Sequence, residues 1–158
     1  MKILIVSDTH GNISNLTKVI NNNKYDYVIH AGDFCVGYSE IKKYVDYVVA
    51  GNNDFEGEKE LFFEIDGIKF VLLHGEYFDS FFDYSSRYKK MVDHYSDKNV
   101  DVIISGHTHI EYCELISNVL CINPGSLYLP RNHSRTKTYA ELIIENKKII
   151  DCVIKELD

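Results

Sequence analysis

The chain begins with a pattern that recurs along it, an apolar run followed by polar residues, in the segment Lys2-Ile3-Leu4-Ile5-Val6-Ser7-Asp8-Thr9-His10. Residues 2–6 form a nearly continuous apolar run that is rich in β-branched side chains. Such a run is typical of a strand that is buried on both faces, as in a parallel sheet. Polar side chains begin at Ser7, so Asp8 and His10 are expected directly beyond the end of a buried strand.

The first third of the chain repeats this arrangement. The hydrophobic pattern predicts a helix that contains Ile13, Leu16, Val19 and Ile20, a strand over 27–31, a short helix over 39–43 and a strand over 47–50. Alternation of strands and helices is typical of βαβ units with a parallel sheet. In such sheets ligands bind beyond the carboxyl ends of the strands. Gly32-Asp33 and Gly51-Asn52-Asn53-Asp54 follow the second and third strands at this position.

The remainder of the chain is richer in strands. The pattern predicts a hairpin of residues 61–65 and 69–73 turning at Asp66-Gly67, a helix over 85–96, a strand over 100–104, a strand pair over 110–116 and 119–122, and a last hairpin of 139–144 and 148–154. His74-Gly75 follows the first hairpin, and Gly106-His107-Thr108-His109 follows the strand over 100–104. Residues two apart point the same way in extended backbone, so His107 and His109 are expected to reach one small volume. The chain is expected to be one α/β domain over residues 1–158, with two β-rich layers flanked by helices.

Composition excludes several classes of protein. The chain has 17 Lys and Arg against 24 Asp and Glu, a formal charge of −7, which argues against a sequence-independent nucleic-acid binder. The four cysteines are widely spaced, without a CxxC motif, so neither a disulfide framework nor a zinc ribbon is expected. No apolar run is long enough to span a bilayer, and the N-terminal run is too short for a signal peptide. We therefore expect a cytoplasmic, reduced protein without a membrane partner.

The five polar strand ends together offer two carboxylates, one amide and four imidazoles, all of which are metal-ligating groups. Seven ligands are too many for one ion, whereas two ions that share one carboxylate would each have four protein ligands. The seven residues are Asp8, His10, Asp33, Asn52, His74, His107 and His109. A mononuclear site, with some of the seven outside the coordination sphere, is the alternative that this count leaves open.

The order of these blocks resembles the calcineurin-like metallophosphoesterase superfamily. The blocks that carry the resemblance are Asp8-Thr9-His10, Gly32-Asp33, Gly51-Asn52-Asn53-Asp54, His74-Gly75 and Gly106-His107-Thr108-His109. The small size and the segment Asn123-Pro124-Gly125-Ser126…Pro130-Arg131 are similar to the compact YfcE-type phosphodiesterase branch, to which the retromer subunit Vps29 is related. The resemblance spans residues 3–131. It implies an αββα sandwich of two mixed β-sheets flanked by helices.

The resemblance also implies a reaction and a ligand set. One metal ion would be held by Asp8, His10, Asp33 and His109, and the second by Asp33, Asn52, His74 and His107, with Asp33 bridging. A small phosphodiester would be hydrolysed by direct attack of a metal-bridging hydroxide. Four imidazoles disfavour Mg²⁺ and Ca²⁺ and leave Mn, Fe, Zn or Ni, of which we favour Mn. The alternative is a metal-free or weakly active interaction scaffold of the Vps29 type, which the intact ligand set disfavours.

Asn53 departs from the family pattern, because many members have a histidine there that is thought to assist the leaving group. Asparagine can donate a hydrogen bond but cannot act as a general acid near neutral pH. We therefore expect good turnover of activated aryl diesters and weak turnover of alkyl monoesters. Asn53, Arg131 and His133 are the candidate substrate-binding residues, since Arg pairs well with phosphate oxygens. The natural substrate stays open among a cyclic nucleotide, another small diester and a nucleic-acid end, and long nucleic acid is disfavoured.

Four further features carry weaker signals. Asp54 either orients a metal ligand or is a solvated turn residue. His30 is expected to pack near the site without binding metal, and His94 to lie on a solvated helix face. An aromatic cluster formed by Tyr77, Phe78, Phe81, Phe82 and Tyr84 is expected to be core or a contact between copies of the chain rather than a base-stacking surface. A homo-oligomer, dimer or tetramer, is the interpretation favoured for this cluster.

Overall fold

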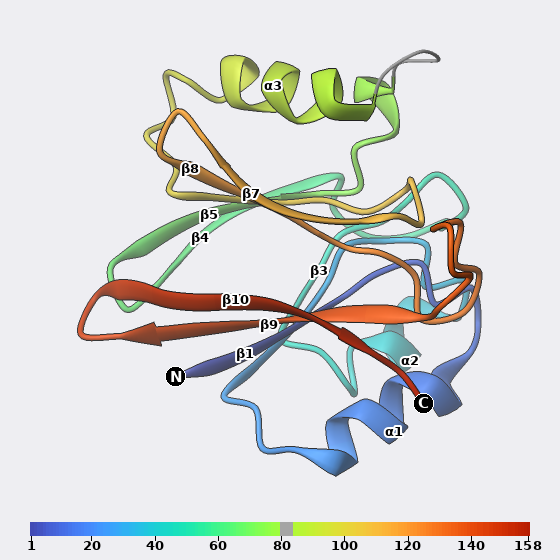
Figure 1. Cartoon of the computed structure of the whole chain (residues 1–158). Helices are drawn as coiled ribbons and strands as arrows, with labels where there is room; N and C mark the ends of the chain where they lie inside the picture. The colour runs from blue at the N-terminus through green and yellow to red at the C-terminus, as the bar shows by residue number, and fades with distance from the viewer. Residues whose placement is uncertain (80–83) are drawn as a thin grey trace.

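Two mixed sheets of five strands each pack face to face, with helices on their outer faces (Figure 1). This computed structural model describes residues 1–79 and 84–158, with the backbone alone for residues 84 and 85. The αββα sandwich expected from the sequence is confirmed. Phe81 and Phe82 of the aromatic cluster lie outside the described residues, so the contact proposed there stays a prediction.

The first sheet has the strand order β10-β9-β1-β2-β3, and its central strands supply half of the site. Its strands are β1 (Lys2–Val6), β2 (Tyr27–His30), β3 (Tyr47–Val48), β9 (Thr138–Glu145) and β10 (Lys148–Glu156). As predicted, β1, β2 and β3 are parallel, with Ile5 opposite Ile29. Their carboxyl ends therefore meet at one edge, where residues 7–10, 31–33 and 49–54 come together.

The second sheet has the order β4-β5-β6-β8-β7. Its strands are β4 (Glu60–Ile65), β5 (Ile68–Leu73), β6 (Val102–Ile104), β7 (Glu111–Ile116) and β8 (Val119–Pro124). The predicted hairpin turns at Asp66 and Gly67, whose φ angles of 47° and 78° suit a tight two-residue turn. Because β5 and β6 are parallel neighbours, His74 and His107 leave the sheet at adjacent strand ends.

The helices cover the outer faces and enclose two further apolar layers. On the first sheet lie α1 (Ile13–Asn22), capped by the Asn12 side chain, and α2 (Tyr38–Ile41). On the second lies α3 (Tyr84–His94), preceded by the unpredicted 3₁₀ helix η1 (Glu76–Phe78). The largest apolar cluster fills the space between the sheets, with Ile5, Leu72 and Ile104 completely buried. Among the described residues, none of the helices combines the length and the apolarity needed to cross a membrane.

Candidate metal centre

The chain turns sharply where the strands end, and the ligand candidates occupy these turns. Asp8, His10, Asp33, His107 and His109 all have positive φ angles, between 43° and 73°. This left-handed region is unfavourable for residues with a Cβ, and strain of this kind is concentrated at functional sites. The expectation that His107 and His109 share a direction through extended backbone is therefore wrong. Their side chains reach different halves of one cluster.

The Asp8 carboxylate lies at the middle of the cluster and is completely buried. Its Oδ2 accepts hydrogen bonds from the Ser7 hydroxyl (2.7 Å) and the His107 backbone N–H (3.0 Å). Its Oδ1 is buried and has no hydrogen-bond partner among the described residues. Three imidazole Nε2 atoms lie close to Oδ1, from His109 at 3.1 Å and from His10 and His74 at 3.8 Å each. A buried carboxylate oxygen without a donor is costly unless a cation or proton lies beside it.

Backbone carbonyls fix the orientation of two of these rings. His109 Nδ1 lies 2.6 Å from the carbonyl oxygen of Leu129, and His74 Nδ1 lies 2.7 Å from that of Ala31. A carbonyl only accepts, so each Nδ1 carries the hydrogen in the neutral ring and each Nε2 presents a lone pair. Metal-ligating histidines are typically held in this way through their other nitrogen.

The second carboxylate, Asp33, continues the cluster toward the second sheet. Its Oδ2 lies 3.7 Å from His10 Nε2 and 3.5 Å from His74 Nε2. Asn53 donates to both Asp33 oxygens, through its backbone N–H (2.9 Å) and its side-chain amide (2.8 Å). The Nε2 atoms of His10 and His109 are only 3.2 Å apart. Without a cation, one of these two nitrogens must carry a hydrogen and donate it to the other, whereas a cation between them would accept the lone pairs of both rings.

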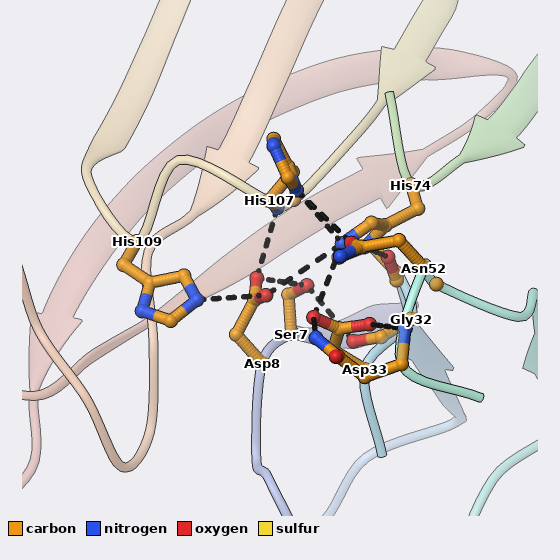
Figure 2. A network of polar contacts seen from close by, with 12 residues as sticks. Ser7, Asp8, Gly32, Asp33, Asn52, His74, His107 and His109 are labelled. Carbon is orange, nitrogen blue, oxygen red and sulfur yellow. Dashed lines mark hydrogen bonds and ion pairs between the residues drawn. The ribbon is translucent and has the colours of Figure 1, made fainter. Parts of the chain in front are cut away.

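The far side of the cluster holds Asn52 and His107. His107 Nδ1 lies 3.2 Å from Asn52 Oδ1 and 3.3 Å from His74 Nε2. Figure 2 shows the Asp8 carboxylate between His109 on one side and the His74 and Asn52 pair on the other. His107 Nε2 is 2.7 Å from a carboxylate oxygen of Asp79. The sequence pattern did not single out Asp79, because no spacing rule connects it with His107.

The electrostatics of the cluster favour positive charge within it. Burial opposes ionisation of Asp33, but hydrogen bonds from His74 and Asn53 and the charge on His74 lower the pKa of this carboxyl well below its usual range. Burial likewise opposes ionisation of Asp8, and His109 and His74 outweigh it, so that the pKa of Asp8 is lowered. Although burial disfavours its protonation, His74 beside the two carboxylates has its pKa raised to about 9. Without a bound cation, the carboxylates thus retain a proton on His74.

The carboxylate of Asp54 positions the loop that carries Asp33. It accepts hydrogen bonds from the backbone N–H groups of Asp33 (2.7 Å), Phe34 (3.3 Å), Cys35 (2.8 Å) and Gly51 (2.8 Å). Of the two alternatives for Asp54, the structure therefore supports orientation of a ligand, which acts through the backbone of the loop that carries Asp33.

Arg87 is a positioning residue that sequence reasoning missed. Its side chain is completely buried, and its Nη2 donates to the carbonyl oxygens of His74 (3.3 Å), Gly75 (3.1 Å) and Gly106 (2.9 Å). These contacts hold the ends of β5 and β6 together beneath the cluster. An arginine in a polar helix gives no sequence signal of this role, because the contacts depend on how α3 packs on the sheet.

The remaining predicted residues lie around the cluster rather than in it. Arg131 and His133 are exposed; the Arg131 backbone N–H donates to the His109 carbonyl (3.0 Å), and His133 makes no hydrogen bond with any described residue. His30 is fully buried, with its Nε2 2.9 Å from the Thr9 hydroxyl, which agrees with a packing role. His94 is exposed, as expected.

The donor set fits divalent cations. Two groups bring their ligand atoms within 4.8 Å of one another: Asp8 with His10 and His109, and Asp8 with Asp33 and His74. Asn52 and His107 adjoin the second group. Imidazole and carboxylate donors together are typical of sites for borderline transition metals. Asp8 belongs to both groups, so the bridging role that we predicted for Asp33 stays a prediction.

An αββα sandwich with such a cluster at its strand ends defines a metallophosphoesterase type of protein. The sequence model of the Calcineurin-like phosphoesterase superfamily domain matches residues 1–147. The chain belongs to this superfamily.

Similar proteins agree with this assignment. A probable metallophosphoesterase of Mycoplasma pneumoniae is 40% identical over 150 residues, which cover 95% of this chain and 94% of the relative. The structure of a conserved uncharacterized protein from Streptococcus pneumoniae, a predicted phosphoesterase, is 25% identical with a TM-score of 0.78, covering 99% of this chain and 96% of that one. An archaeal phosphodiesterase is 28% identical with a TM-score of 0.71, covering 98% and 100%.

The fold alone is shared with two more distant structures. Zinc-bound Vps29 from Entamoeba histolytica has a TM-score of 0.74, and the phosphoesterase YfcE from E. coli has a TM-score of 0.66. Each is 18% identical to this chain and covers nearly all of it.

Proposed function

We propose that this protein hydrolyses a small phosphodiester at a centre of two divalent transition-metal ions, with Mn favoured. The observation that carries the proposal is the buried Asp8 Oδ1, which lacks a hydrogen-bond donor and has three imidazole nitrogens within 3.8 Å. The relatives named metallophosphoesterase and phosphodiesterase support the reaction class.

The ligand assignment follows the two halves of the cluster. Asp8, His10, Asp33 and His109 would hold one ion, and Asp33, Asn52, His74 and His107 the other. Two divalent ions in such a site supply Lewis acidity toward the phosphate and lower the pKa of water. The protein's own contribution is to keep each donor in place before substrate arrives, through the Leu129 and Ala31 carbonyls.

Charge explains how an acidic protein would attract a phosphodiester. Two divalent ions held by two ionised carboxylates leave a local charge of about +2, since the other ligands are neutral. The formal charge of the whole chain is −7. A small anion therefore benefits from the centre, whereas a long nucleic acid would also be repelled by the net negative charge of the chain.

Asn53 sets the expected substrate preference. Its side-chain amide donates to Asp33 Oδ2 at 2.8 Å and cannot supply a proton to a departing alkoxide. Esters with a good leaving group need no such proton. We therefore expect turnover of activated aryl diesters and weak turnover of alkyl phosphate monoesters.

The decisive test begins with protein purified without chelator. Elemental analysis should find divalent metal, and anomalous scattering from crystals should show two peaks between Asp8 and Asn52. A panel of diesters and monoesters, assayed with Mn²⁺, Fe²⁺, Zn²⁺ and Ni²⁺ in turn, should show metal-dependent diesterase activity. Efficient alkyl monoesterase activity without diesterase activity would refute the proposed preference, and a single anomalous peak would refute the dinuclear centre.

The alternative function is an interaction scaffold like Vps29, with which this chain shares its fold. Absence of both bound metal and activity in the same assays would favour it. The predicted cytoplasmic location and the homo-oligomer remain parts of our proposal to be tested separately, by fractionation and by light scattering.

A further inference from the structure

A cavity of about 440 Å³ opens directly beside the metal centre. It is lined by residues 35–38, after β2, and by residues 53–56, after β3. Two of its lining residues touch the ligand cluster: Asn53 hydrogen-bonds to Asp33, and Cys35 Sγ lies 3.6 Å from His10 Nδ1. A group attached to a phosphate at the centre could therefore extend into this cavity without crossing other parts of the protein.

Two aromatic side chains, Tyr38 and Phe55, line the cavity. Tyr38 is half-buried, and its ring packs against Phe34 with the centroids 6.4 Å apart. The backbone at Gly57 closes on the same ring, since a Cβ there would lie 3.3 Å from Tyr38 Cε2. Phe55 is fully exposed and makes no ring contact with any described residue. The cavity thus combines one fixed ring with one that has no ring partner among the described residues.

The charges in the cavity limit what it can accept. None of the eight described lining residues is cationic. The Asp54 carboxylate is already occupied by four backbone N–H groups, and Glu56 is exposed with its negative charge free. A second phosphate or a carboxylate would find no stabilising partner here, whereas an uncharged aromatic ring could stack on Phe55 or Tyr38.

We propose that this cavity, the Phe55 pocket, binds an uncharged aromatic substituent of the phosphodiester, an aryl ring or a nucleobase. The inference rests on the proposed function, because it places the phosphate at the metal centre. Stacking of one ring on an aromatic side chain changes affinity by about 5- to 150-fold on removal of that side chain. The pocket volume lies within the range of small-molecule sites and accommodates one ring system.

Binding of alkyl and aryl diesters that lack an activated leaving group tests the pocket through affinity rather than through turnover. Calorimetry on the Mn²⁺-loaded protein would compare dimethyl, methyl phenyl and diphenyl phosphate. Methyl phenyl phosphate should bind about ten-fold more tightly than dimethyl phosphate. Diphenyl phosphate should bind little more tightly than methyl phenyl phosphate, because the pocket accepts one ring. Methyl 4-carboxyphenyl phosphate should lose this gain. Thymidine 5′-(methyl phosphate) distinguishes a nucleobase from a simple aryl ring as the natural occupant. If it binds more tightly than methyl phenyl phosphate, the pocket is assigned to nucleosides.

Alanine substitutions show which aromatic residue provides the gain in affinity from the first ring. Phe55→Ala should abolish the advantage of the first ring while leaving the affinity for dimethyl phosphate unchanged. Phe62→Ala, on β4, is the matched control and should keep the advantage, because Phe62 is an exposed aromatic residue that does not line the pocket. Loss of the advantage in Tyr77→Ala rather than in Phe55→Ala would overturn the proposal, because Tyr77 is an exposed aromatic residue outside this pocket.

The outcomes separate this inference from the proposed function. A wild-type protein that binds metal and hydrolyses diesters but binds all three phosphates equally would overturn the Phe55 pocket alone. A protein that binds neither metal nor dimethyl phosphate would overturn the proposed function, and the pocket with it.

Discussion

At the scale of single residues, Asp8 and Asp33 differ in how their oxygens are satisfied. Asp8 Oδ1 has no donor, whereas both Asp33 oxygens accept hydrogen bonds from Asn53. Both carboxylates lie close to His74 Nε2, at 3.8 Å and 3.5 Å. Either carboxylate is therefore placed to bind both ions, and substitution of each residue can show which one does.

We expect Asp33→Asn to lower diesterase activity by about 100-fold or more and to impair the binding of both ions, since loss of a metal ligand or its support strongly weakens a metal site. Single histidine variants such as His109→Gln should impair one ion and retain the other. Metal titration by calorimetry would measure both effects, with the exposed Asp93→Asn as control. If Asp33→Asn still binds two ions while Asp8→Asn binds none, Asp8 is the bridging residue.

Asp79 should control the ring orientation of His107. Its carboxylate accepts from His107 Nε2 at 2.7 Å, which leaves Nδ1 to face Asn52 and His74. Loss of such a partner typically weakens metal affinity by about 10- to 100-fold. We expect this loss for one ion in Asp79→Asn, and a changed ¹⁵N signature of the His107 ring in the metal-free protein. Glu76→Gln removes the same charge from the same segment and should change neither quantity.

His30 should make the metal-free protein sensitive to acid. Burial lowers the pKa of His30 to about 4, from an ordinary value of 6.5. Between these two values the unfolded chain binds a proton that the folded chain does not, so stability falls as the pH falls from about 6.5 to about 4. The shift corresponds to a loss on the order of 3 kcal/mol across this window.

Urea unfolding of the metal-free protein at several pH values would measure this loss. His30→Asn should be less stable at neutral pH but should have a flatter dependence on pH below 6.5. The exposed His94→Gln should keep the wild-type slope. An unchanged slope in His30→Asn would show that another group causes the acid sensitivity.

At the scale of elements, the strand ends approach one another so closely that a glycine is required. A Cβ at Gly51 would lie 2.1 Å from Asp33 Oδ1 and 2.5 Å from the Asp33 backbone nitrogen. These atoms cannot move without displacing the carboxylate that we propose as a ligand.

Gly51→Ala should therefore lower stability by about 1–3 kcal/mol and weaken metal binding as well. Gly37 provides the matched control, because a Cβ there would meet nothing within 4 Å. Gly37→Ala should alter stability by no more than about 0.5 kcal/mol. Thermal unfolding and metal titration of the two variants check the expectation; equal behaviour would mean that the loops after β2 and β3 can separate freely.

The elements were predictable because their signals are local. The apolar run of residues 2–6 and the Asp66-Gly67 turn each depend on a few adjacent residues, and both predictions are confirmed. The gathering of the ligand candidates was predictable too, since parallel strands end at one edge. The left-handed backbone of His107 and His109 was not predictable, because the pattern indicated only that a strand ends before them. The contacts of Asp79 and Arg87 depend on η1 and α3 packing against the second sheet, which no spacing in the sequence reveals.

At the scale of the whole molecule, the candidate ligands come from both sheets. Asp8 and Asp33 follow strands of the first sheet, and His74 and His107 follow strands of the second. Metal binding should therefore stabilise the entire sandwich. An ion present at 100 times its dissociation constant adds about 2.7 kcal/mol.

We expect Mn²⁺ to raise the melting temperature and a chelator to reverse the increase. Asp33→Asn should melt at a temperature that does not depend on metal, and Asp93→Asn should respond like the wild type. Differential scanning calorimetry measures the shift; an equal shift in Asp33→Asn would place the stabilising ion elsewhere.

Because the candidate ligands come from both sheets, a bound ion would also restrict the motion of one sheet relative to the other. The sheets are joined by an apolar layer, which has no directional bonds and permits small sliding displacements between the layers. An ion held by Asp8 from one layer and His109 from the other would oppose such displacements at one end of the sandwich. Amide hydrogen exchange in β1 and β6 would then slow together on metal binding, so that strands in separate sheets would open as one cooperative unit.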